Sequence, residues 1–263
     1  MRIVSLVPSW TETLIAAGLP PVGRTRYCIH PAAKVAEIPV IGGTKDVDWQ
    51  GVAALNPELI LADREENQRE VLKRAPCPVF VSHVTDIPSL IDDLRRLEAW
   101  LCSRLGHDTG LRALRERWCV QARTVRHTDP SDLPAIRHWI QRPGGKVDRI
   151  FYMVWRDPWI AASRHTFIGA IFGALGIGDM IPELPSPYST VDLDAVAGPS
   201  NLILFPSEPY PFETPGTIPP DLVRKGPCAI VDGEAYAWYG IRSLRMLEAI
   251  PPVRVSRAIP PGG

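Results

Sequence analysis

Short apolar runs alternate with helix-forming segments along this chain of 263 residues. In the first half, the runs at 3–7, 58–62 and 78–82 have the length and the Val, Ile and Leu content of buried strands. Helices are expected at 9–17 and 65–75, after the first two of these runs. Strands separated by helices predict a parallel sheet, with ligand-binding loops at the carboxyl ends of its strands.

The second half of the chain repeats this pattern. Strands are expected at 149–155, 201–205 and 228–232, and helices at 166–175 and 238–249. The segment VDWQGVAALNPELIL (47–61) also aligns without gaps on VDLDAVAGPSNLILF (191–205). Each copy predicts an acidic helix start, a short helix and a buried strand. The similarity indicates either a duplicated lobe or a chance likeness between apolar elements.

Between the halves, apolar residues recur at helical spacing from Ile87 to Leu105, and charged residues fill the opposite face. A helix of roughly 20 residues spans about 30 Å. The sequence therefore predicts an α/β fold of two lobes joined by one long helix, with a ligand cleft between the lobes. The expected divisions are an N-terminal lobe at 1–85, the linking helix at 86–106, a helical and turn-rich connection at 107–147 and a C-terminal lobe at 148–263.

Composition excludes several classes of function. The 29 Lys and Arg residues balance 29 Asp and Glu residues, and no basic run occurs, which argues against nucleic acid as a partner. No apolar run reaches the roughly 20 residues of a spanning helix, so no membrane insertion is expected. The five cysteines form no CxxC metal pattern and no disulfide framework. The usual motifs of serine hydrolases, P-loop proteins and zinc proteases are missing, so no enzyme activity is expected.

The first residues bear on the expected compartment. Met1 and Arg2 lead directly into a five-residue apolar run, which is too short for the apolar core of a secretory signal. Unpaired cysteines also fit a reducing compartment. We therefore expect a cytoplasmic protein, or a periplasmic one if the start is truncated, and we expect a monomer.

Aromatic residues gather in the loops that follow the expected strands. They are Trp10, Tyr27, Trp155, Trp159, Tyr210, Phe212, Trp238 and Tyr239. Flat aromatic faces suit a large planar or macrocyclic ligand, and Tyr and Trp add a hydrogen-bonding tip. The alternative is that about half of these side chains fill the core beneath the loops.

Polar residues in the same loops extend the candidate site. Cys28 and His30 lie two residues apart and are candidate ligands for a soft or borderline metal, with Glu208 as a possible third ligand. The alternative is that Cys28 packs as a small hydrophobe and His30 caps the loop. Glu208 lies between prolines on a rigid ledge, where its carboxylate would accept hydrogen bonds from ligand amides or from its own loop.

Two arginines and a helix start complete the candidate site. The planar guanidinium of Arg156 or Arg242 would bind a carboxylate or phosphate through two hydrogen bonds. The alternative for Arg156 is an ion pair within its turn, and the alternative for Arg242 is a role in helix packing. Ser9 and Glu12 have the spacing of a capping box, so Ser9 is expected to start the first helix. Free N–H groups at a helix start also favour anions.

Taken in order, the segments PSWTET, VGRTRYCIHP, IGGTK, LNPELILADREEN, WRDPW, LFPSEPYPF and DGEAYAWYGIR resemble a known family. This is the class III periplasmic-binding-protein-like family for iron chelates and vitamin B12, and the chain is most similar to its helical-backbone metal receptor and cobalamin-binding-protein-like branch. The resemblance covers residues 1–250. It implies two Rossmann-like lobes, a rigid backbone helix and only small closure around a ligand.

The resemblance also implies a function. The chain is expected to bind a metal chelate such as cobalamin or another corrinoid, a haem-like macrocycle or a ferric siderophore. Components of an ABC transporter would be partners, and acidic residues such as Glu65, Glu66 and Glu70 would dock there. The alternative is a cytosolic metal-binding or metallocofactor-handling enzyme on the same scaffold, using Cys28, His30 and Glu208.

Overall fold

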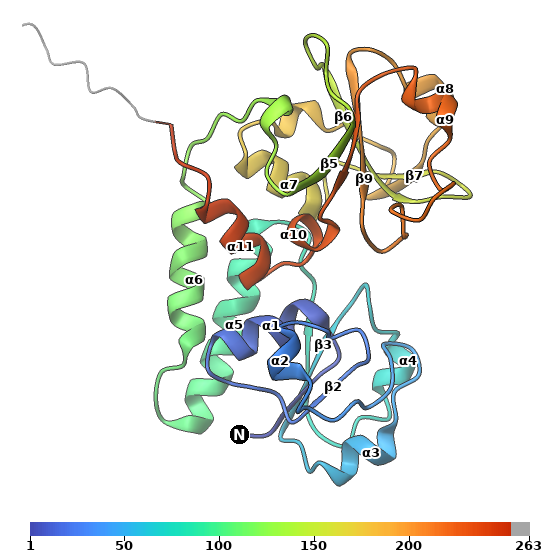
Figure 1. Ribbon diagram of the computed structural model, residues 1–263. Coiled ribbons are helices and arrows are strands. Elements are labelled where there is room, and N and C mark those ends of the chain that lie inside the picture. Colours follow the sequence, from blue (N-terminus) through green and yellow to red (C-terminus); the bar gives the residue numbers. More distant parts are fainter. Residues whose placement is uncertain (254–263) are drawn as a thin grey trace, which may run out of the picture.

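The computed structural model describes residues 1–253. Figure 1 shows two α/β lobes, one above the other, with helices along one side of both. The expected two-lobed α/β fold is confirmed. The predicted limits of the four divisions stay a prediction, and residues 254–263 of the last one lie outside the described residues.

The N-terminal lobe is built on a four-stranded parallel sheet, as the alternation of strands and helices predicted. Its strand order is β2-β1-β3-β4, with β1 at Ile3–Ser5, β2 at Gly23–Arg24, β3 at Leu59–Asp63 and β4 at Val79–Ser82. Its helices are α1 (Pro8–Ala16), α2 (Ala32–Val35), α3 (Trp49–Ala54) and α4 (Arg69–Leu72). All five residues of β3 are buried, because the sheet is covered on both faces.

The C-terminal lobe contains a mixed six-stranded sheet in the order β5-β10-β9-β6-β7-β8. The strands are β5 (Ile136–Gln141), β6 (Arg149–Trp155), β7 (Ile160–Ala162), β8 (Tyr188–Thr190), β9 (Asn201–Pro206) and β10 (Cys228–Val231). The central strands β10, β9 and β6 are parallel, whereas β5, β7 and β8 pair in antiparallel fashion. The other elements are α7 (Phe167–Ala174), α8 (Leu193–Val196), α9 (Pro220–Val223), α10 (Gly233–Ala237), α11 (Ile241–Glu248) and the 3-10 turns at Pro130–Asp132 and Gly178–Met180.

Two long helices run along the side of both lobes. They are α5 (Ile87–Leu105) and α6 (Gly110–Gln121). Asp86 and Ser89 form a capping box at the start of α5, and Gly106 ends this helix with a φ of 72°. Glu98 of α5 accepts hydrogen bonds from Arg112 and Arg115 of α6, each at 2.8 Å. Burial acts to raise the pKa of Glu98, but the two arginines lower it below its ordinary value.

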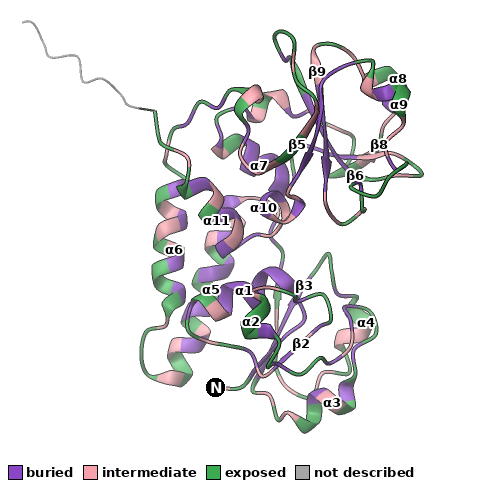
Figure 2. Ribbon diagram, in the orientation of Figure 1, coloured by how far each residue is buried: buried purple, intermediate pink, exposed green. Residues whose placement is uncertain are grey.

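One apolar core continues through both lobes. It runs from Ile3 and Leu61 in the first sheet, past the buried leucines of α5, to Ile150 and Leu204 in the second sheet. Figure 2 shows the buried residues along the sheets and on the inner sides of the helices. Because a shared core resists separation of its halves, the lobes are held in a fixed relation. None of the helices within residues 1–253 has the length and apolarity to cross a bilayer.

The predicted elements agree with the structure best where the pattern was longest, as in α5. The expected capping box at Ser9 and Glu12 is wrong: α1 begins at Pro8 after Val7, and no side chain caps it. The expected helix at 65–75 shortens to α4, because residues 65–68 form the end of a loop. The two similar segments do form the same unit, since Asp48 and Asp192 cap short helices that lead into central strands.

Candidate functional site

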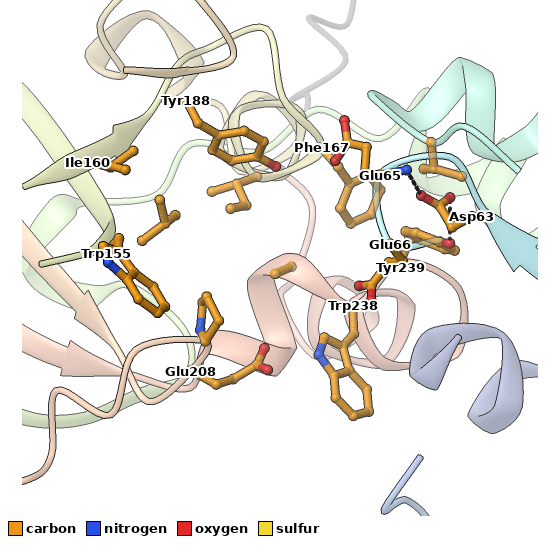
Figure 3. A pocket seen from close by; sticks show the side chains of 15 residues that line it. Asp63, Glu65, Glu66, Trp155, Ile160, Phe167, Tyr188, Glu208, Trp238 and Tyr239 are labelled. Atoms are coloured by element: carbon orange, nitrogen blue, oxygen red, sulfur yellow. Dashed lines mark hydrogen bonds between the residues drawn. The ribbon is translucent and has the colours of Figure 1, made fainter. Parts of the chain in front are cut away.

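A cavity of about 410 Å³ lies between the lobes and opens to solvent. Loops at the carboxyl ends of β3, β4, β6 and β9 reach it, as parallel strands favour. Its apolar and aromatic lining comes from Val84, Val154, Trp155, Ile160, Phe167, Ile168, Tyr188, Pro209, Ala237, Trp238 and Tyr239. Its acidic lining comes from Asp63, Glu65, Glu66 and Glu208. In Figure 3, Trp155 and Glu208 face the acidic N-terminal loop across the cavity, and Trp238 and Tyr239 lie between them.

A buried hydrogen-bond network links the two halves of the chain at the base of the cavity. The Tyr239 hydroxyl donates to Asp63 Oδ2 at 3.0 Å, and Ser82 Oγ donates to the same oxygen at 2.6 Å. The Trp10 indole N–H in turn donates to Ser82 Oγ at 2.9 Å. Burial, followed by the charge of Asp63, raises the pKa of Tyr239 well above its ordinary value. Tyr239 is therefore a neutral donor that fixes Asp63 in place.

A chain of ionic contacts lies beside Trp238. His30 in the N-terminal lobe contacts Glu234 of α10 at 3.0 Å, and Glu234 contacts Arg242 at 2.9 Å. Arg242 also donates to both carboxylate oxygens of Glu12 in α1, at 2.8 and 3.2 Å. The Arg242 guanidinium lies over the Trp238 ring at 5.4 Å. These contacts bind the two halves of the chain to each other next to the cavity.

Two carboxylates of the cavity have strongly raised pKa values. Burial, then the charges of Asp63 and Glu65, raises the pKa of Glu66 to about 7. Burial, then the charge of Glu234, raises the pKa of Glu208 to about 7. Both groups thus change charge near neutral pH, which is a common property of functional sites.

The predicted site residues fall into three groups. Four of them line the cavity: Trp155, Glu208, Trp238 and Tyr239. Three others contact this lining. The ring centroid of Tyr210 lies 5.3 Å from that of Trp155, and the ring centroid of His30 lies 5.8 Å from that of Trp238. The Arg242 guanidinium lies over the Trp238 ring. The remaining six, Ser9, Trp10, Tyr27, Cys28, Arg156 and Trp159, do not line the cavity. The ligand-binding role of all thirteen stays a prediction.

Most of the third group is packed or hydrogen-bonded away from the cavity. Trp10 is fully buried, and Ser9 is 5% exposed. Arg156 donates to the carbonyl oxygens of Gly216 and Thr217 rather than pointing into the cleft. Trp159 stacks on Phe212 with an interplanar angle of 8°, in a separate apolar cluster of the C-terminal lobe. Tyr27 is 53% exposed and lies beside Arg26.

The structure does not bring Cys28 and His30 together as metal ligands. Cys28 is fully buried, and its sulfur lies 3.0 Å from Thr11 Oγ1 and 3.2 Å from Thr25 Oγ1. Burial raises the pKa of the Cys28 thiol, which disfavours the thiolate that a metal requires. Within residues 1–253, no three His, Cys, Asp or Glu side chains are placed to hold a metal ion.

Several lining residues were not expected to bind ligand. The loop after β3 was expected in the cleft wall, but Glu65 and Glu66 were interpreted as docking residues for a transporter. The structure places both in the cavity, whereas Glu70 pairs with Lys73 on α4. Tyr188 was missed because β8 has only three residues and follows a proline-rich turn. The adjacent acidic residues of D-R-E-E-N, directly after a buried strand, were the available signal for the N-terminal side.

Comparison with known proteins finds vitamin B12-binding proteins among the relatives of this chain. No protein-family model matches the chain. The vitamin B12-binding protein of Salmonella typhimurium is 33% identical over 109 residues, which cover 38% of this chain and 38% of that protein. The vitamin B12-binding protein of Yersinia pestis is 24% identical over 200 residues, or 74% of this chain and 65% of that protein. The alignment thus spans little more than a third of the length of the first of these curated relatives.

Solved structures extend the likeness to the whole fold. The periplasmic vitamin B12 binding protein of Vibrio cholerae has a TM-score of 0.62 at 17% identity, with 94% of each chain covered. The periplasmic haem-binding protein of Roseiflexus has a TM-score of 0.65 at 18% identity, covering 94% of this chain and 95% of that one. The chain therefore has the two-lobed fold of class III periplasmic binding proteins, and the resemblance expected from its motifs is confirmed. By their names these proteins are binding proteins, not enzymes.

The expected cytoplasmic location is wrong. Several solved structures that share this fold are, by their names, those of periplasmic proteins. The expectation depended on the first residues of the sequence. These residues form β1 of the first sheet, so they carry no information about the compartment.

Proposed function

We propose that this chain is a binding protein that holds a metal chelate, of the corrinoid, haem or ferric-siderophore class, in the cavity between its lobes. The observation that carries the proposal is the cavity itself, which loops from both lobes build and line with Trp155, Tyr188, Trp238 and Tyr239. Aromatic faces bind a planar ring system by burial and stacking, and an open mouth leaves room for ring substituents. The vitamin B12-binding relatives support the same class of ligand.

The contacts between the lobes define how such a ligand would enter. The shared core and the Arg242 contacts to Glu12 and Glu234 hold the lobes in one relative position. Binding would therefore order side chains at the mouth of a preformed cleft rather than close a hinge. Trp155 and Tyr188, which are 44% and 42% exposed, are aromatic lining residues with room to move onto a ligand.

The likeness to transport proteins supports a delivery role for this chain. One solved structure with the same fold is an ABC transporter substrate-binding protein of Listeria monocytogenes, with a TM-score of 0.65 at 14% identity. By analogy, the chain would act in the periplasm as a monomer and pass its ligand to an ABC transporter. The alternative of a metal-dependent enzyme gains no support, because Cys28, His30 and Glu208 do not converge.

A ligand screen tests the proposal. The purified chain is mixed with cyanocobalamin, haemin or ferrioxamine, and binding is followed by native mass spectrometry and tryptophan quenching. At least one class is expected to bind in a one-to-one complex. Replacement of Trp155 or Trp238 by Ala should weaken that complex about two- to tenfold, which corresponds to the loss of one aromatic contact.

A control tryptophan lies outside the cavity. Trp100 on α5 packs under Arg104, with the guanidinium 3.7 Å from its ring. Trp100→Ala should leave affinity unchanged while altering total fluorescence. If none of the three ligand classes binds, or if Trp155→Ala and Trp238→Ala bind as tightly as Trp100→Ala, the proposed function is wrong.

A further inference from the structure

The charged side chains that line the cavity are all acidic. Four of the fifteen side chains that line it are carboxylic acids: Asp63 at the end of β3, Glu65 and Glu66 in the loop after it, and Glu208 in the loop after β9. Among the described residues, no Lys, Arg or His lines the cavity. The acids therefore line the cavity from both lobes, as Glu66 and Glu208 illustrate (Figure 3).

Basic side chains near the cavity lie outside its lining. His83 lies 3.9 Å from Glu65, and Arg242 contacts Glu12 and Glu234 rather than Glu208. The charge of Lys45 opposes the rise in the pKa of Glu66, and the charge of Arg64 opposes the rise in the pKa of Glu65. Neither of these cations lines the cavity.

The acids also differ in what they can still bind. Asp63 is satisfied by Ser82, Tyr239 and the backbone N–H of Glu65. Glu66 and Glu208 instead face the cavity, where burial, followed by the charges of neighbouring acids, raises their pKa values. Around Glu208, Glu234 and Asp232 act in this direction, and a hydrogen bond from Trp238 opposes it. Repulsion between these ionised acids lowers the stability of the unliganded chain, and a positively charged ligand removes this repulsion.

Resting on the proposed function, we propose that the cleft selects a chelate by charge. Its ligand is a corrinoid that carries net positive charge, as when the anionic phosphate arm is missing, rather than haem. The amide side chains of a corrin ring offer N–H donors to Glu66 and Glu208. The propionates of haem would instead meet carboxylates across a partly desolvated cavity, which is unfavourable.

Two corrinoids that differ mainly in charge form the sharpest test. Aquacyanocobinamide is a monocation, and dicyanocobinamide is its neutral counterpart with cyanide in place of the axial water. Cyanocobalamin is a neutral corrinoid with the phosphate arm, and haemin supplies the anionic macrocycle. Titration calorimetry at pH 7.5 should rank aquacyanocobinamide first and haemin last. Added salt should weaken aquacyanocobinamide but not dicyanocobinamide, because screening acts on the charged pair.

Two conservative variants assign the preference to the cavity acids. Glu66→Gln and Glu208→Gln keep shape and remove charge. Each should weaken aquacyanocobinamide about fivefold, the effect of a unit charge at about 9 Å with an effective dielectric of about 40. Each should weaken dicyanocobinamide less, because that ligand loses only a charge-assisted hydrogen bond from its amides and no net charge attraction. Glu70→Gln on α4, which removes an exposed acid outside the cavity, is the matched control and should change neither affinity.

The outcomes separate this inference from the proposed function. Equal affinities for the cationic and neutral cobinamides in the wild type, with no salt dependence, overturn charge selection and leave chelate binding intact. A preference that survives in both Gln variants overturns the role of Glu66 and Glu208. If haemin binds more tightly than any corrinoid, the ligand class inferred here is wrong. Failure of every chelate to bind is a failure of the proposed function.

Discussion

Replacement of Arg242 by Met removes the guanidinium that joins three elements at the junction of the lobes. Arg242 is 21% exposed in its side chain, and its partners Glu12 and Glu234 are only 6% and 12% exposed. Loss of the cation leaves two nearly buried carboxylates with weaker partners, namely Arg245 at 3.7 Å from Glu12 and His30 at 3.0 Å from Glu234. Breaking a buried ion pair in this way costs about 3 kcal/mol of unfolding free energy.

Urea unfolding followed by tryptophan fluorescence measures this loss, and calorimetry should show a melting temperature about 6 °C lower for a chain of this size. Arg245→Met is the matched control, because Arg245 lies on the same helix but is 63% exposed. It should cost less than about 1 kcal/mol. A double variant with Glu12→Gln should recover part of the loss, since it removes one orphaned charge. If the two Arg variants are equally stable, the Arg242 contacts do not hold the lobes together.

Three further predictions concern stability. Gly240→Ala should cost about 3 kcal/mol in urea unfolding, because Gly240 has a φ of 92° and a Cβ there would lie 2.0 Å from Thr13 Oγ1; a cost below 1 kcal/mol would contradict the packing. Glu98→Gln should lower the unfolding free energy by about 2 kcal/mol, since it weakens two charge-assisted hydrogen bonds. On folding, the pKa values of Glu66 and Glu208 rise from 4.5 to about 7. Between these pH values the folded chain holds more protons than the unfolded chain, so ionisation of the two carboxyl groups lowers the unfolding free energy, and the full loss is reached above pH 7. Their double Gln variant should therefore melt higher than the wild type at pH 8 and not at pH 4, and an equal difference at both pH values would refute the pKa shifts.

Sequence patterns predicted the helices and strands that depend mainly on the local sequence. The segment 87–105 forms α5 as predicted, because a long amphipathic repeat and a Gly stop leave little choice. The strand at 149–155 also has the predicted bounds. The antiparallel strands β7 and β8 were missed, because runs of three residues carry too little periodicity to be recognised.

Side-chain placement in the site was harder to predict, because similar loops send aromatic residues in opposite directions. Trp155 ends β6 and Trp159 lies in the turn that follows, yet Trp155 lines the cavity and Trp159 packs against a separate apolar cluster of the lobe. Similarly, Trp10 is fully buried, whereas Trp238 lines the cavity. Which ring faces a ligand depends on the packing of both lobes, and no local pattern encodes it. The acidic side of the cavity was visible as D-R-E-E-N, but its charge was assigned to a different surface.

The location of the metal in a complex is the most direct test of the binding site. Crystals grown with a cobalt corrinoid and measured at the cobalt absorption edge reveal the cobalt atom by anomalous scattering. We predict one strong peak per chain, enclosed by Trp155, Tyr188 and Trp238. A peak on an outer face of either lobe, with the cavity still filled by solvent, would contradict the account.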